Sequence, residues 1–144
     1  MNDRWNNAEL YESYVGRWSS LVSAKFLKWM NVGNGLVWLD VGCGTGALTK
    51  AILNSQNTRK VISIDPSEYH INFCREFIPD SKAEYYLSGA EKIPLEDKTV
   101  DVIVSGLVLN FIPNIKPAMS EFKRAAKDNA VIGAYVWDYS GEWK

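Results

Sequence analysis

The segment at residues 40–47 combines glycines and a carboxylate in a pattern that could bind a ligand. Gly42, Gly44 and Gly46 follow directly after an apolar run, and Asp40 precedes the first of them by two residues. Glycine has no Cβ, so a ligand can touch the backbone there. A strand that turns into a helix also aims backbone N–H groups at the space above the strand end. We therefore interpret the segment as a binding loop with unpaired amides.

Two classes of nucleotide ligand fit this loop. Gly42, Gly44 and Ala47 match the GxGxxA fingerprint of NAD-binding proteins, and Asp65 lies 23 residues after Gly42, near the distance expected of a ribose-binding acid. Asp40 argues against NAD, because a carboxylate at the strand tip repels a pyrophosphate and attracts an ammonium or sulfonium group. The loop therefore favours a positively charged nucleoside, and an NAD-dependent oxidoreductase stays open as an alternative.

Short apolar runs alternate along the chain with segments whose apolar residues recur at helical spacing. These are the elements that must position the loop. This alternation predicts an α/β fold, in which a parallel sheet is covered by helices on both faces as a three-layer Rossmann-like sandwich. We expect strands at residues 36–41, 61–64, 83–88, 100–105 and 131–137. We expect helices over residues 11–29 and 47–54, one that opens at Ser67 and one that follows Pro117. The first helix is expected to bend or split near Gly16, Ser19 and Ser20.

The composition argues against several other kinds of protein. The chain has 144 residues, the size of one domain, and 16 Lys and Arg against 17 Asp and Glu leave a net charge of -1. We therefore expect neither nucleic acid nor a membrane as a partner. Two cysteines and one histidine cannot supply a structural zinc site, so no metal is expected. Without a signal-like or membrane-spanning apolar run, we expect a cytoplasmic protein with reduced thiols.

Residues 37–46 resemble motif I of the class I S-adenosylmethionine-dependent methyltransferases, and three later segments extend the resemblance. Residues 64–67 resemble the segment after motif I, residues 89–95 the stretch written DAExLPF, and residues 99–105 the fourth strand. The resemblance covers nearly the whole chain, from about residue 11 to residue 139. It implies a single domain over residues 1–144, with N-terminal lid helices in residues 1–32 and a core at 36–139. It also implies strand order 3-2-1-4-5 and S-adenosylmethionine as cofactor, with S-adenosylhomocysteine as its product.

The resemblance also implies roles for individual residues. Gly42, Gly44 and Gly46 would approach the methionine part of the cofactor, and Asp40 would reach its ammonium group directly or through water. Asp65 would accept hydrogen bonds from both ribose hydroxyls. The other implied contacts are Cys43 in the loop, Pro66 and Ser67 beside the adenine, Ala90 and Glu91 at the adenine edge largely through backbone, Ser105 and Leu107 on the methionine side, and Tyr11, Tyr14, Arg17 and Trp18 on the lid.

Two of the departures from the family pattern bear on the site and on assembly; a third, residues 127–130 in place of a common Pro-Gly-Gly turn, is still competent turn chemistry. Gly89 stands where the family usually has an acid that bonds the adenine amino group. After the fifth strand, the chain lacks the final strands, including the antiparallel one that pairs beside the fifth strand in the family. Residues 131–137 would then form an apolar sheet edge, which invites pairing with another chain. We therefore expect a homodimer or a higher assembly that covers this strand.

The methyl acceptor and any catalytic base are left unassigned. Residues 105–108 lack the motif of enzymes that methylate amino groups on bases or glutamine, and there is no basic cluster for nucleic acid. A small-molecule acceptor is therefore expected. A cofactor-binding module that acts through oligomerisation without catalysis stays open as an alternative to the methyltransferase.

Overall fold

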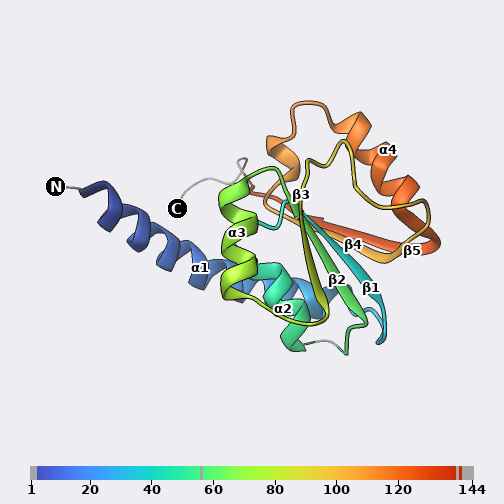
Figure 1. Ribbon diagram of the computed structural model, residues 1–144, viewed down its shortest axis with the longest axis horizontal. Coiled ribbons are helices and arrows are strands. Elements are labelled where there is room, and N and C mark those ends of the chain that lie inside the picture. Colours follow the sequence, from blue (N-terminus) through green and yellow to red (C-terminus); the bar gives the residue numbers. More distant parts are fainter. Residues whose placement is uncertain (1–2, 56, 139, 141–144) are drawn as a thin grey trace.

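Five parallel strands form one sheet in a computed structural model that describes residues 3–55, 57–138 and 140, with side chains from residue 17 onward (Figure 1). The strand order is β3-β2-β1-β4-β5, which confirms the predicted Rossmann-like order. The strands are β1 (Val37–Val41), β2 (Lys60–Asp65), β3 (Ala83–Leu87), β4 (Val100–Gly106) and β5 (Ala126–Tyr135). All four pairings between neighbouring strands are parallel, so the carboxyl ends of all five strands point the same way.

Helices cover the two faces of the sheet unequally. Figure 1 shows α2, α3 and the end of α1 on one side and α4 on the other. The second face is completed by the 88–99 connection, whose Ala90 and Ile93 pack in the same core as α4. The helices are α1 (Asp3–Met30), α2 (Ala47–Ser55), α3 (Glu68–Phe77) and α4 (Ile115–Ala125), with a short 3-10 turn, η1 (Leu109–Phe111). The sheet is thus the middle layer of three, as predicted.

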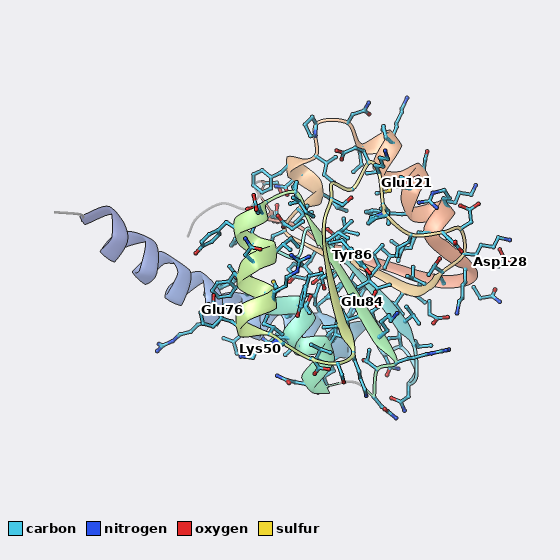
Figure 2. All side chains as sticks on the ribbon, viewed as in Figure 1. Lys50, Glu76, Glu84, Tyr86, Glu121 and Asp128 are labelled. Carbon is cyan, nitrogen blue, oxygen red and sulfur yellow. The ribbon has the colours of Figure 1, made fainter. Side chains whose placement is uncertain are left out.

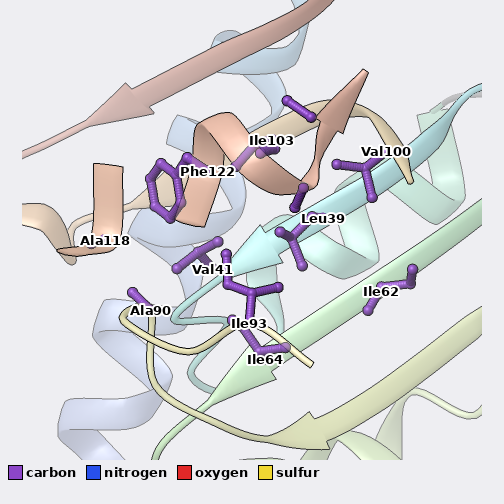
Figure 3. Packing of buried hydrophobic residues seen from close by; sticks show 12 residues of the cluster. Leu39, Val41, Ile62, Ile64, Ala90, Ile93, Val100, Ile103, Ala118 and Phe122 are labelled. Carbon is purple, nitrogen blue, oxygen red and sulfur yellow. The ribbon is translucent and has the colours of Figure 1, made fainter. Parts of the chain in front are cut away.

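Alternate residues of β1 feed two separate cores. Trp38 packs with Leu48 and Ile52 of α2, whereas Leu39 and Val41 pack on the opposite face. Figure 3 shows the second core, with Phe122 of α4 beside Ile103 of β4. A strand that is buried on both faces needs an unbroken apolar run, and β1 has one except at Asp40. That exception lies where the strand ends and the glycine loop begins.

Several element boundaries differ from the sequence expectation. For example, α4 begins at Ile115, so it contains Pro117 in its first turn instead of following it. The N-terminal segment is one continuous helix of 28 residues, so the expected split near Gly16 is wrong. A single helical glycine costs only about 1 kcal/mol, and the apolar packing of Phe26 and Leu27 against the sheet offsets that cost. The fifth strand begins at Ala126, not at residue 131, and its pairing with β4 shifts register between Val100 and Val102. The expected N-cap of α3 is confirmed, because the Ser67 side chain accepts a hydrogen bond from the His70 amide.

Replacing Phe122 with alanine tests whether α4 is held mainly by its apolar face. The Phe122 side chain is 2% exposed, so Phe122→Ala is expected to lower the free energy of unfolding by about 3–5 kcal/mol. Phe77→Ala is the matched control on α3, where the side chain is 63% exposed, and it should cost less than about 1 kcal/mol. Urea denaturation measures both values, and equal losses would contradict the packing described here.

Candidate functional site

The candidate site lies at the carboxyl ends of β1, β2 and β4, where the glycine loop connects β1 to α2. A cavity of about 270 Å³ opens beside the loop. Its lining brings together four of the predicted residues, Gly42, Pro66, Ala90 and Glu91, which come from three separate segments of the chain. Ligands of open parallel sheets bind at this end, outside the strand termini. The structure therefore gathers these predicted residues around a single space.

The backbone amides of the glycine loop are bonded to the neighbouring strand. The amides of Gly42 and Cys43 both donate to the Ile64 carbonyl, at 2.8 and 3.0 Å, and the Gly44 amide donates to Asp65 Oδ2 at 2.9 Å. The Gly46 amide donates to the Cys43 carbonyl at 2.9 Å. The expectation of unpaired amides is therefore wrong for these four groups. The loop folds across the end of β2, where a buried N–H without a partner would be costly.

Gly44 is the glycine of this loop whose Cα faces open space. Its φ is +54°, and a Cβ added there would meet nothing within 4 Å. A Cβ on Gly42 would lie 2.6 Å from Val108, and one on Gly46 would collide with Ile78. Gly42 and Gly46 are therefore needed for packing, whereas Gly44 leaves a backbone surface that another molecule can touch.

Asp40 is a carboxylate buried beneath the loop. Only 1% of the residue is exposed, and Oδ2 accepts a hydrogen bond of 2.7 Å from the Thr49 hydroxyl, in the first turn of α2. Burial raises the pKa of Asp40 to about 6, the hydrogen bonds from Thr49 oppose this, and the charge of Asp65 adds to it. A ligand would therefore feel the Asp40 charge through the loop or a water molecule, because the carboxylate has almost no exposed surface.

Asp65 lies beside Asp40 on the next strand and is nearly saturated by the protein. Its Oδ1 accepts hydrogen bonds from the Ser67 amide at 2.8 Å and from His70 Nδ1 at 3.1 Å, while Oδ2 accepts from Gly44. An ionised carboxylate has about four acceptor positions, so roughly one is left on Oδ2. The sequence did not identify His70 as part of this site, because it gave no sign that the ring turns toward Asp65.

Cys43, Ser105 and Leu107 hold the framework of the site. The Cys43 and Cys74 thiols are buried, and both approach the Gly44 carbonyl, at 3.8 and 3.3 Å. The Ser105 hydroxyl donates to the Val41 carbonyl at 2.9 Å, which ties β4 to β1. The Leu107 amide donates to the backbone carbonyl of Tyr135 at 2.7 Å. These groups therefore fix the positions of the strand ends that surround the loop.

The predicted lid residues belong to α1, and of those whose side chains the structure describes, neither Arg17 nor Trp18 lines the cavity. Arg17 is exposed to solvent, and Trp18 stacks near Trp137 with ring centroids 6.2 Å apart. The side chains of Tyr11 and Tyr14 lie outside the described residues. Ser20 of α1 lines a second cavity together with Gly46 of the loop.

One wall of the cavity comes from residues that the sequence analysis missed. Val108, Phe111, Ile112 and Pro113 follow β4 and line the cavity together with Pro66 and residues 88–91. Phe111 is 67% exposed although it is a large aromatic residue. The available signal was an apolar cluster directly after the carboxyl end of a strand, which is a common position for ligand contacts.

The described parts of the chain contain neither a membrane-spanning helix nor a cluster of metal ligands. No described helix is both long enough and apolar enough to cross a membrane. No group of three or more His, Cys, Asp or Glu side chains among the described residues could hold a metal ion.

The family model and the relatives found by comparison with known proteins are all methyltransferases. A methyltransferase domain model matches residues 39–133, which is more than half of the chain. A malonyl-[acyl-carrier protein] O-methyltransferase from Yersinia pestis is 32% identical over 102 residues, covering 68% of this chain and 35% of the relative. A demethylmenaquinone methyltransferase from Staphylococcus aureus is 30% identical over 135 residues, covering 90% of this chain and 53% of the relative. The chain therefore spans between about a third and a half of the length of these relatives.

A solved structure agrees with the sequence relatives. A SAM-dependent methyltransferase from Aquifex aeolicus superposes with a TM-score of 0.76 at 28% identity, covering 85% of this chain and 67% of the other.

The buried carboxylate predicts a specific pH dependence of stability. The pKa of Asp40 is about 6 in the folded protein and 3.8 ordinarily, so the unfolded state loses its proton first as the pH rises. Ionisation of Asp40 should therefore lower the free energy of unfolding by about 2–3 kcal/mol between pH 4 and pH 7, with no further loss above. Urea denaturation of the wild type and of Asp40→Asn over this range isolates the effect. If the free energies of unfolding of the wild type and of Asp40→Asn differ by the same amount at every pH, the burial argument is refuted.

Proposed function

This chain belongs to the family of class I S-adenosylmethionine-dependent methyltransferases, and on that premise we propose that it binds S-adenosylmethionine and transfers its methyl group to a small-molecule acceptor. The observation that carries the proposal is the open backbone at Gly44, flanked by Asp40 below the loop and Asp65 on the next strand. Two neighbouring carboxylates suit a ligand with ammonium and sulfonium groups and disfavour a pyrophosphate.

The proposed ligand follows the loop from the cavity towards α1. We place the adenine in the cavity, between Pro66 and the apolar wall that includes Phe111. The ribose would then lie at Asp65, where one hydroxyl can use the remaining acceptor position on Oδ2. A second hydroxyl needs the Gly44 amide to release that oxygen, so we expect the loop to shift on binding. The methionine part would cross the exposed face of Gly44.

The reaction asks the chain mainly for position and exclusion of water. S-adenosylmethionine supplies a methyl group on a sulfonium, and transfer is an in-line displacement in which the new bond to the acceptor forms as the S–C bond breaks. The charge is lost from sulfur in this step, which leaves S-adenosylhomocysteine. The loop fixes the sulfur relative to the acceptor, and the apolar residues after β4 keep water out. One relative is named for methylating malonyl-[acyl-carrier protein] and the other for methylating demethylmenaquinone. These names support a small-molecule acceptor.

A cofactor-binding module without catalysis is the second candidate function. It is favoured by the hydrogen bonding around the loop, since Thr49, Asp65 and Ser105 all use their polar groups within the protein. The Thr49 and Ser105 hydroxyls are therefore already engaged, and Asp65 keeps only about one acceptor position. Transfer of labelled methyl groups from S-adenosylmethionine into a metabolite extract separates the two candidates, because a module that only binds would leave the label on the cofactor.

Titration calorimetry with S-adenosylhomocysteine and with NAD tests the binding proposal. We expect saturable binding of S-adenosylhomocysteine and none of NAD, because the carboxylates oppose a pyrophosphate. Gly44→Ala should weaken the binding of S-adenosylhomocysteine at least tenfold, since its methyl group would occupy the ligand surface. Saturable binding of NAD alone would instead support the oxidoreductase that the GxGxxA spacing left open.

Gly35→Ala is the matched control for this variant. Gly35 also has a positive φ, +71°, and a Cβ there would meet nothing within 4 Å, but Gly35 precedes β1 at the opposite end of the sheet. Both alanines should cost about 1–2 kcal/mol of stability through left-handed backbone strain. Only Gly44→Ala should lose affinity, and a similar loss in Gly35→Ala would show that general destabilisation is responsible.

We also propose that two copies of this chain associate through β5. The two edges of the sheet differ in character. At β3, Glu84 forms a salt bridge of 2.9 Å with Lys60 and accepts a hydrogen bond from Tyr86, and Figure 2 shows Glu84 and Tyr86 on this strand. At β5, the salt-bridged Lys127 and Asp128 lie at the start of the strand, and further along it Val131 and Ile132 are 44% and 50% exposed. Charged residues protect an edge strand from pairing, and an apolar edge promotes it.

Sedimentation velocity at tens of micromolar tests this association. The wild type is expected to sediment as a dimer or a larger assembly, and Ile132→Lys as a monomer, because a charge on the edge strand opposes pairing. Leu87→Lys is the control on the opposite edge, where Leu87 is 56% exposed, and it should leave the assembly intact. A monomeric wild type would rule the proposal out.

A location in the cytoplasm stays a prediction, supported by the two free cysteines.

A further inference from the structure

Two thiols meet at the Gly44 carbonyl. Cys43 belongs to the glycine loop and Cys74 to α3, and their sulfur atoms approach this one oxygen at 3.8 and 3.3 Å. The two side chains also pack in one buried cluster with Ile71 and Tyr85. The sequence contains only these two cysteines, so within one chain each can pair only with the other. The fold thus brings together two thiols that are separated in the chain by α2, β2 and most of α3.

Cys74 is the thiol better suited to react first. Hydrogen bonding between the two side chains raises the pKa of Cys43 and lowers the pKa of Cys74. Because the thiolate is the reactive form of cysteine, this difference favours Cys74 as the nucleophile. Both residues are buried, since Cys43 is 7% exposed and Cys74 is fully enclosed. An oxidant therefore reaches the pair only when the loop moves away from α3.

A covalent bond between the two sulfurs would change the loop at its ligand face. A disulfide holds its sulfur atoms about 2 Å apart, which is closer than two thiols that are only in contact. Because Cys74 lies inside a regular helix, the movement falls on the loop and draws Cys43 towards α3. Cys43 is bonded in the chain to Gly44, whose amide donates to Asp65 and whose carbonyl faces both thiols. The disulfide would therefore fix the backbone that the ligand is expected to touch.

We propose that Cys43 and Cys74 form a reversible disulfide that weakens the binding of the cofactor. The inference rests on the proposed function, because it assigns a regulation to the same site. Both hydroxyls of the ribose can bind only if the Gly44 amide releases Asp65 Oδ2, and a loop that is crosslinked to α3 cannot make this shift. The reduced protein binds the nucleoside and the oxidised protein does so poorly.

Hydrogen peroxide is the oxidant that we name for this step. The Cys74 thiolate attacks one peroxide oxygen, the O–O bond breaks, and the departing hydroxide takes up a proton to become water. The Cys43 thiol then attacks the sulfur of the resulting sulfenic acid, so the S–S bond forms and the S–O bond breaks to release a second water. Two electrons pass from the two sulfurs to the peroxide. A dithiol such as dithiothreitol reverses the change by exchange and is itself oxidised to a disulfide.

Calorimetry with S-adenosylhomocysteine on the reduced and the peroxide-treated protein tests the proposal. Mass spectrometry after unfolding and alkylation identifies the internal disulfide, because that chain is two hydrogens lighter and takes up no alkyl group. We expect the oxidised wild type to bind about tenfold more weakly or worse, and dithiothreitol to restore the affinity. By linkage, saturating S-adenosylhomocysteine should make the disulfide easier to reduce by the same factor in a glutathione buffer.

Cys74→Ser is the control that cannot form the bond. Its hydroxyl keeps a donor beside the Gly44 carbonyl, and the variant retains Cys43 and all three methionines, so it also controls for other oxidation by peroxide. The affinity of this variant should be the same before and after peroxide treatment. Thermal unfolding shows whether the variant is folded, and Cys43→Ala, compared with itself in the same way, is a second variant with the same expected result.

The possible failures are distinguishable. If the reduced wild type does not bind S-adenosylhomocysteine, the proposed function is wrong and the regulation is overturned with it. If the reduced protein binds but peroxide produces no internal disulfide, or one that leaves the affinity unchanged, the cofactor proposal stands and the redox proposal is overturned. An equal loss of affinity in peroxide-treated Cys74→Ser has the same meaning.

Discussion

The site depends on the attachment of the glycine loop to the end of β2. Gly42 and Cys43 share the Ile64 carbonyl, and Gly44 donates to the Asp65 carboxylate. Because three consecutive amides are bonded to one neighbouring strand, the path of the loop is set by the register between β1 and β2. The same bonds bring Asp65 against the loop and leave the Gly44 surface open. A shift of β2 by one residue would remove these contacts together.

Two carboxylates close together in a nearly dry place are unfavourable for the unliganded protein. Burial and the neighbouring Asp65 both raise the pKa of Asp40, which means that the folded state resists the second negative charge. A ligand that brings positive charge removes part of this penalty, so the binding energy for a cation includes the relief of a cost already present in the fold. Functional sites often retain such locally unfavourable arrangements. The hydrogen bonds from Thr49 keep Asp40 in place without neutralising it.

The framework around the loop is held on the β4 side by bonds that the ligand does not need to touch. Ser105 bonds to the Val41 carbonyl, and Leu107 bonds to Tyr135 of β5. Tyr135 in turn contacts α1, through the Ser23 hydroxyl at 3.3 Å and the Phe26 ring at 4.9 Å. The N-terminal helix, the last strand and the glycine loop are thereby linked in one chain of contacts. Association through β5 would act on the same part of the structure.

The sequence by itself determined the order of the elements, the class of fold and the family, because apolar periodicity and the glycine motif are local signals that survive without tertiary information. It identified Asp40, Gly44 and Asp65 as neighbours, because each follows or ends a parallel strand. Only the tertiary structure decided which groups are free. The loop amides proved to be paired with β2, because a buried amide takes whichever acceptor the neighbouring strand presents. The contact of His70 with Asp65 depends on a side-chain direction, which no spacing in the sequence specifies.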